Sequence, residues 1–94
     1  MPYQLEFSQE ALREWNDLDN NVRSQFQKKL TERLAYPRIV SARLSGQPDC
    51  YKIKLRSAGY RLVYKVSDQT VTVVVIAVGK RDRDAVYRAA IQRL

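Results

Sequence analysis

The feature that most constrains the fold is a run of nine uncharged residues from Thr70 to Val78. Every residue in it except Ala77 is Val, Ile or Thr, and such branched side chains favour extended backbone because they pack well on a pleated surface. A strand with one solvated face alternates apolar and polar residues, whereas this run is almost continuously apolar. We therefore predict a central strand over residues 70–78, in a sheet that is covered on both faces.

Three further strands are predicted around this one. Apolar and polar residues alternate over residues 3–7, which is the period of a short half-buried strand. The same alternation over residues 51–56 places the apolar side chains on one face and the basic side chains on the other. Residues 60–66 return as an antiparallel partner after a tight turn, in which Gly59 is free to take a positive φ.

Three helices are predicted from apolar residues spaced three and four apart. The first covers residues 9–18, with Ser8 as its N-cap. The polar residues 19–21 break it and cap a second helix, which ends just before Pro37. A last helix covers residues 84–94 and has a narrow apolar face. This face consists of Ala85, Val86, Ala89, Ala90 and Leu94.

The predicted order is strand, helix, helix, three strands and a helix, which defines a small α+β fold with a mostly antiparallel sheet and a helical hairpin on one side. Its length predicts a single domain over residues 1–94. One Cys and no His exclude a disulfide framework and argue against a structural zinc site. We therefore expect no metal and no cofactor. We also expect no membrane segment and a cytoplasmic location, because neither a membrane span nor a signal peptide is recognisable.

Positive charge is concentrated in the second half of the chain. Residues 1–49 contain 7 basic and 7 acidic residues, whereas residues 50–94 contain 10 basic and 3 acidic ones, which accounts for the whole net charge of +7. Such an asymmetry indicates a polyanionic partner, most often a nucleic acid. The alternative interpretation is a charged surface that keeps the protein soluble by repulsion.

Five of these cations are expected to share one face of the sheet, and we refer to them as the basic cluster. They are Lys52, Lys54, Arg56, Arg61 and Arg81. Residues two apart on a strand are about 6.5–7 Å apart on the same face, and residues 50–67 contain no acid to neutralise them. Because like charges on one face repel each other, we interpret the basic cluster as a binding surface rather than a solvated face.

An aromatic residue and two more cations, Lys80 and Arg83, complete the candidate site. Tyr87 follows Arg83 by one helical turn and can stack on a base, which contributes about 1–3 kcal/mol in single-strand recognition. Packing between the last helix and the sheet is an equally good explanation of Tyr87. We expect Arg56, Lys80 and Arg83 to contact RNA outside the cleavage chemistry.

Four segments together resemble the RelE toxins of bacterial toxin–antitoxin systems, and the resemblance extends over essentially the whole chain. The segments are residues 50–57, 59–64, 78–81 and 86–87. The resemblance implies a fold similar to small microbial ribonucleases and cleavage of mRNA in the ribosomal A site. It also implies as partners a RelB-type antitoxin, the mRNA and the 70S ribosome with its 16S rRNA. The functional positions of the family fall on Lys52, Lys54, Arg61, Arg81 and Tyr87.

The same residues suit metal-independent RNA cleavage, in which the ribose 2′-OH attacks the adjacent phosphate. The reaction needs a base, an acid, and cations that stabilise the charge of the phosphorane. Without histidine a lysine must be the base, and crowding by other cations lowers its pKa because like charges disfavour the protonated form. We assign this role to Lys52, with Lys54 as the alternative. Arg61 would hold the phosphate and Arg81 the leaving oxygen, whereas the proton donor stays open.

Two other functions are compatible with this sequence. The related ParE toxins share the fold but inhibit DNA gyrase by binding, without cleaving RNA. A basic RNA-binding module with no catalysis is the third interpretation. Only the leading interpretation, a ribosome-dependent mRNA endonuclease toxin that inhibits translation, predicts message cut to leave a 5′-OH end.

Overall fold

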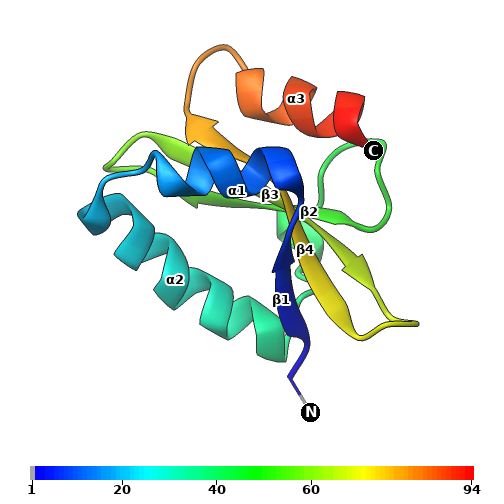
Figure 1. The fold of residues 1–94 in the computed structure, drawn as a ribbon. Coiled ribbons are helices and arrows are strands. Elements are labelled where there is room, and N and C mark those ends of the chain that lie inside the picture. The colour runs from blue at the N-terminus through cyan, green and yellow to red at the C-terminus, as the bar shows by residue number, and fades with distance from the viewer. Residues whose placement is uncertain (1) are drawn as a thin grey trace.

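The structure, a computed structural model, describes residues 2–94 and is built on a sheet of four strands in the order β1–β4–β3–β2. The strands are β1 (Gln4–Phe7), β2 (Cys50–Leu55), β3 (Tyr60–Ser67) and β4 (Thr72–Lys80). The helices are α1 (Gln9–Asn16), α2 (Asn20–Ala35) and α3 (Ala85–Arg93), with a short 3-10 helix η1 (Val40–Ala42) in the connector. β1 pairs with β4 in parallel, and the other pairs are antiparallel. The predicted α+β fold is confirmed (Figure 1).

Polar side chains begin both helices of the N-terminal hairpin. The Ser8 hydroxyl accepts a hydrogen bond from the Ala11 amide at 3.2 Å, and an Asp19 carboxylate oxygen accepts one from the Val22 amide at 2.9 Å. Caps of this kind satisfy amides that the first turn leaves free, and each contributes about 1 kcal/mol. α2 ends at Ala35, because Pro37 disfavours helical backbone at the residue before it.

β4 lies between β1 and β3, and most of its side chains are buried, as predicted for a central strand. Its ends differ from the predicted range of residues 70–78. It starts at Thr72, because Val71 lies in the turn after β3 with a φ of 53°. It continues through Gly79 and Lys80, which pair with the beginning of β3. Lys80, which lies beyond the predicted end of the strand at residue 78, therefore belongs to β4.

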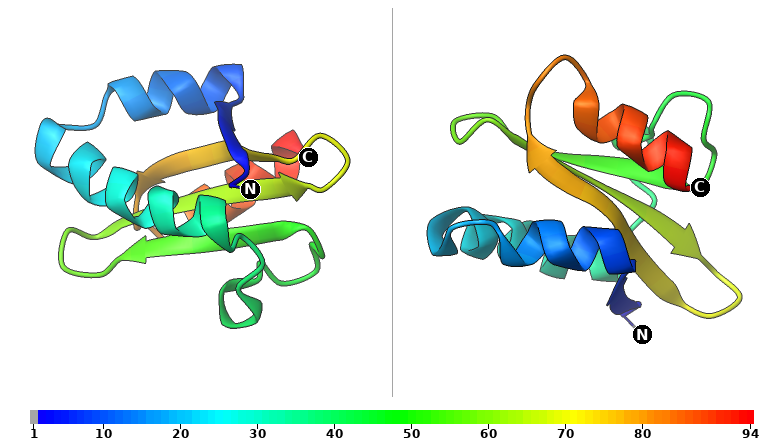
Figure 2. Two further views of the ribbon diagram at one scale, coloured as in Figure 1. Left: turned by 90° about the horizontal axis from the view of Figure 1, so that it is seen from below. Right: turned by 45° about the horizontal axis from the view of Figure 1, so that its top comes forward.

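Helices cover both faces of the sheet (Figure 2). α1 and α2 bury Trp15 and Phe26 in a core that includes Tyr64 of β3. α3 packs on the opposite face, where Val86 and Ala90 join a second core. The predicted position of the helical hairpin on one side is thus confirmed, and α3 forms a third layer.

The predicted apolar face of α3 is only partly correct. Val86 and Ala90 are buried, and Ala85 and Ala89 are half-buried. Leu94 is 44% exposed, because it follows the last helical residue and is not carried onto the sheet by the helical period. Only one turn of α3 therefore supplies fully buried apolar side chains.

Candidate active site

The β2–β3 hairpin places two members of the basic cluster directly opposite each other. Lys54 on β2 pairs with Arg61 on β3, so both side chains lie on the face of the sheet that α3 covers. The alternating Tyr51, Ile53 and Leu55 are buried on the other face, as the period of the strand predicts. The apolar residues of the hairpin thus pack into the core on one face of the sheet and hold in place the strands that carry the cations on the other face.

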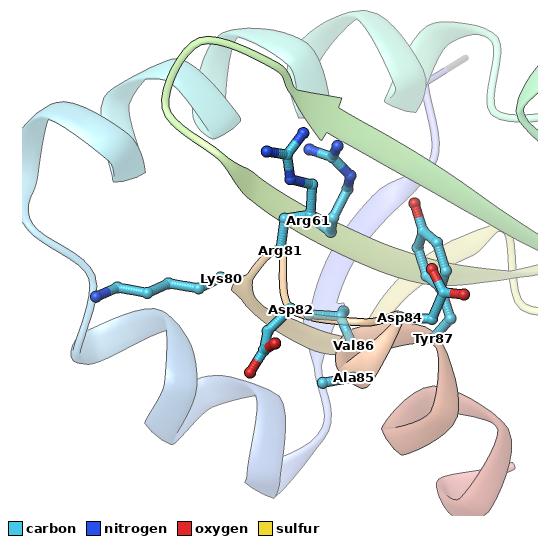
Figure 3. Close-up of a pocket in the computed structure, with 8 residues that line it drawn as sticks. All are labelled: Arg61, Lys80, Arg81, Asp82, Asp84, Ala85, Val86 and Tyr87. Carbon is cyan, nitrogen blue, oxygen red and sulfur yellow. The ribbon is translucent and has the colours of Figure 1, made fainter.

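Arg61 is less accessible than the sequence suggested, since only 8% of its surface is exposed. Its Nη1 donates a hydrogen bond to the Tyr60 carbonyl at 2.9 Å. Arg81 follows the end of β4, and its amide donates to the Gly59 carbonyl at 2.7 Å, which ties the loop to the β2–β3 turn. The side chains of Arg61 and Arg81 line one small pocket and extend in the same direction (Figure 3). The fold therefore brings together two arginines that lie 20 positions apart in the sequence.

Tyr87 contributes both to packing and to the site. Its half-buried ring contacts the second core, and the Nζ of Lys52 lies 5.4 Å from the ring centroid. Burial raises the pKa of Tyr87, and the positive charge of Arg61 opposes that rise. Its hydroxyl is buried and makes no hydrogen bond within residues 2–94. A buried polar group of this kind is available to a ligand that supplies the missing partner.

The lysine with a lowered pKa is Lys54. The positive charge of Lys52 is the largest cause, and partial desolvation and the charges of Arg56 and Arg61 act in the same direction. Asp84 opposes them by favouring the protonated amine. Lys54 is exposed, so its amine is accessible to a substrate. These properties favour Lys54, the alternative of the sequence analysis, over Lys52 as the candidate base.

The three cations that were expected to contact RNA outside the cleavage chemistry do not all lie together. Arg56 lies in a groove along β2 together with Lys52 and Lys54. Lys80 extends away from the two arginines of the pocket (Figure 3). Arg83 is exposed in the loop before α3 with a φ of 48°, and its carbonyl accepts a hydrogen bond from Arg88.

Two residues at the site were not identified from the sequence. Asp84 lines the pocket of Arg61 and Arg81, and its charge favours the protonated form of Lys54. Arg33 reaches the groove along β2 from α2. Nothing in the sequence singles out Arg33, because its position beside β2 depends on how α2 packs on the sheet.

The site is cationic and has no metal-binding group. Within residues 2–94 the ion pairs involve Arg38 and Arg93, and none involves a member of the basic cluster. The described part of the chain contains no group of three or more His, Cys, Asp or Glu side chains that could hold a metal ion. None of its helices is long and apolar enough to cross a membrane. The arrangement can bind a phosphate, stabilise negative charge and transfer a proton through a lysine.

A family comparison defines the class of protein to which this fold and site belong. The sequence model of the ParE toxin of the type II toxin–antitoxin system parDE matches residues 5–85. The fold and the basic site are therefore those of a toxin of a type II system.

Curated relatives narrow this class. The chain is 56% identical over 94 residues to the mRNA interferase toxin RelE of Escherichia coli K12, covering 100% of this chain and 99% of the relative. It is 50% identical to a putative RelE-like toxin protein of Escherichia coli over the same 94 residues, with 100% and 99% covered. The chain belongs to the RelE toxins of the RelE/ParE superfamily.

Solved structures agree with this assignment. A mutant of the Escherichia coli toxin RelE in the free state superimposes with a TM-score of 0.91 at 54% identity, covering 100% of this chain and 99% of that one. The toxin chain of the intact Escherichia coli RelBE toxin–antitoxin complex gives a TM-score of 0.82 at 58% identity, covering 86% and 99%.

Proposed function

We propose that this protein is a ribosome-dependent mRNA endonuclease that cleaves message in the ribosomal A site and so inhibits translation. The observation that carries the proposal is the position of Lys54, an exposed lysine with a lowered pKa that lies directly opposite Arg61. The name of the 56% identical Escherichia coli relative, an mRNA interferase, supports the same reaction.

In the proposed mechanism Lys54 removes the proton from the ribose 2′-OH, which attacks the adjacent phosphorus. The bond from phosphorus to the 5′ oxygen of the next nucleotide breaks, leaving a 2′,3′-cyclic phosphate. The 5′ oxygen takes up one proton from the solvent to become a 5′-OH, and Lys54 later returns the proton it removed. Arg61 and Arg81 stabilise the charge of the phosphorane, and Lys52 adds positive charge beside them. Tyr87 holds a nucleotide in line for attack. The proposed steps use no metal ion.

The ribosome supplies what the isolated site lacks. An isolated lysine, with a pKa of about 10.4, is almost wholly protonated at neutral pH, and the cations around Lys54 lower its pKa from that value. A weak base makes the reaction depend on precise orientation of the 2′-OH and the phosphate. We propose that the decoding centre imposes this orientation on the message, and that the protein acts in the cytoplasm.

A translation extract programmed with a defined message tests the proposal. Primer extension is expected to show cuts with a 5′-OH end in the presence of the protein. Arg81→Ala should reduce the cleavage rate by about 10²–10³-fold, as for loss of one charge-stabilising donor, and Lys54→Ala should reduce it at least as far. Lys28→Ala, which removes an exposed cation of α2, is the matched control. Intact message with the parent protein, or a parent-like rate for Arg81→Ala, would contradict the mechanism.

A second candidate function is inhibition of gyrase, because the family model that matches is that of the ParE toxins. A DNA supercoiling assay with purified gyrase distinguishes the two. The proposed function predicts no inhibition of gyrase at concentrations that cleave ribosome-bound message. Inhibition of gyrase without RNA cleavage would establish the ParE-like activity, and RNA binding without either effect would identify a non-catalytic module.

We also propose a RelB-type antitoxin as the physiological partner, supported by the solved RelBE complex of Escherichia coli. Acidic residues of such a partner would pair with the basic cluster and remove its charge from the RNA. Amide exchange with and without the cognate antitoxin is expected to show increased protection of residues 51–66. If α3 is displaced in the complex, residues 84–94 exchange faster there than in the free toxin.

A further inference from the structure

The open edge of the sheet at β2 forms a groove beside the candidate active site. β2 is the last strand of the sheet, and we refer to the space along it as the edge groove. The edge groove has a volume of about 250 Å³ and is lined by Arg33, Ser41, Ala42, Lys52, Lys54 and Arg56. Four of its six residues are cations and none is an acid. A groove with this charge is suited to an anion.

Arg33 reaches the edge groove from α2, which covers the face of the sheet opposite to α3. It belongs to the last turn of α2. Its Nη1 donates to the Tyr64 hydroxyl at 2.9 Å and to the Lys52 carbonyl at 3.3 Å, and its guanidinium lies 5.8 Å from the centroid of the Tyr64 ring. Tyr64 is completely buried, and its hydroxyl donates to the Pro37 carbonyl at 2.6 Å. Arg33 is therefore held in place by rigid neighbours.

The contacts of Arg33 orient its charge but do not neutralise it. Both hydrogen bonds use Nη1, and the other guanidinium nitrogens donate to nothing within residues 2–94. Arg38 and Arg93, by contrast, each form ion pairs with carboxylates. A guanidinium fixed in this way, with free donors, matches the bidentate geometry of a phosphate.

We propose that the edge groove binds a second phosphate of the RNA strand, next to the phosphate that is cleaved, and that Arg33 is its principal ligand. This inference rests on the proposed function. Lys54 lines the edge groove and also lies opposite Arg61, so the two phosphate sites meet at this residue. Lys52 and Lys54 lie two residues apart on β2, and such residues are about 6.5–7 Å apart on one face of a strand. The bound strand would thus follow β2 from the active site towards Arg33.

The test uses ribosomes programmed with a message that carries a 2′-O-methyl group at the cleavage position, which binds but cannot be cut. In two further messages a neutral methylphosphonate replaces the phosphate on either side of the scissile one. Arg33→Gln keeps donors for Tyr64 and Lys52 but removes the charge, and Arg33→Lys restores the charge. Lys28→Gln removes an exposed cation of the same helix outside the edge groove.

Arg33→Gln is expected to weaken binding of the normal message roughly tenfold, as for the loss of one charge-assisted contact, and Arg33→Lys should recover part of the loss. One of the two methylphosphonate messages should bind the parent protein more weakly than the normal message does, by a similar factor. Arg33→Gln should bind that message and the normal message equally well. Lys28→Gln should bind like the parent throughout. Parent-like binding by Arg33→Gln, or equal sensitivity of both proteins to each methylphosphonate, overturns the inference. The parent protein's cleavage of unmodified message decides the proposed function separately.

Discussion

Lys54 is the residue on which the chemistry of the site depends, and its neighbours set its proton affinity. The charge of Lys52 is the largest cause of its lowered pKa, and Arg56 and Arg61 act in the same direction. Asp84 acts in the opposite direction. The balance between these cations and one acid therefore sets the direction in which the pKa of Lys54 departs from that of an ordinary lysine.

This balance predicts opposite shifts in two variants. Lys52→Gln removes a like charge, so the protonated form of Lys54 becomes more favourable and its pKa rises towards the ordinary lysine value. Asp84→Asn removes an attractive charge, so the pKa of Lys54 falls further. NMR titration of the Lys54 side-chain resonances measures both shifts. Lys65→Gln, at an exposed position further along β3, serves as the control, and an unmoved midpoint in Lys52→Gln would mean that charge crowding is not the cause.

Val71 shows a conflict between local and tertiary preference. Its φ of 53° is unfavourable for a branched side chain, yet its carbonyl accepts a hydrogen bond from the Gln4 amide at 2.9 Å. The side chain is 43% exposed and contributes little to the core. The turn between β3 and β4 is therefore strained at this residue because β1 pairs with the beginning of β4.

Val71→Asn is expected to increase the free energy of unfolding by about 1 kcal/mol, because asparagine tolerates left-handed backbone better than a branched residue. Denaturant unfolding of the parent and the variant measures the difference. Val40→Asn is the matched control, since Val40 is 73% exposed and has no positive φ. If Val71→Asn lowers the free energy of unfolding by more than the control variant does, the backbone at Val71 is not strained.

At the scale of the elements, α3 is held at both ends of its contact with the sheet. Val86 and Ala90 supply its buried apolar area. At its C-terminal end Arg93 forms a bidentate pair with Glu14 of α1, at 2.9 and 3.0 Å, and also donates to the Ile76 carbonyl at 2.8 Å. Glu14 in turn accepts a hydrogen bond from the Val78 amide at 3.2 Å. The ion pair thus links α1, β4 and α3 where β4 extends beyond β1.

Glu14→Gln is expected to loosen α3 without unfolding the protein. The variant retains an acceptor for the Val78 amide but loses the charge that pairs with Arg93. Because this pair is partly exposed, its loss should cost at most about 1 kcal/mol, and amide exchange in residues 85–93 should accelerate severalfold. Glu32→Gln, at an exposed position of α2, is the control. Unchanged exchange in α3 would show that the apolar contacts alone hold the helix.

At the scale of the whole molecule, the charge distribution favours a polyanionic partner. The excess of +7 lies in the second half of the chain, and the fold gathers most of the basic cluster on the face and edge of one hairpin. Lys80 does not join it, since its side chain extends away from Arg61 and Arg81 (Figure 3). The binding surface is therefore smaller than the total charge suggests.

The affinity for programmed ribosomes is accordingly expected to fall steeply as salt rises, because phosphate contacts release counterions. Each contact to a single strand contributes about −0.7 to the slope of log affinity against log salt. Arg56→Gln should make the slope shallower by about this amount, whereas Lys28→Gln should leave it unchanged. Filter binding at several salt concentrations measures the slope. A slope near zero for the parent would indicate that the basic half serves solubility alone.

The fold was predictable from sequence because its determinants are local. The alternation of residues 51–56 decides which side chains face the core, and Ser8 and Asp19 cap their helices through hydrogen bonds within one turn. The apolar composition of residues 70–78 predicts a covered strand. These patterns depend on neighbours in sequence, so they do not require knowledge of the tertiary structure. The exact ends of β4 did require it, because pairing with β1 and β3 sets them.

For the candidate site, the sequence by itself determined which cations share a strand face and that they lack an acid nearby in the chain. Only the tertiary structure decided that Asp84 enters the same pocket, that Arg61 is buried, and that Arg33 reaches across from α2. The physical reason is that these contacts join segments from different layers of the fold. Their charges act on one another through space, and the distances between these charges are set by how α2 and α3 pack on the two faces of the sheet.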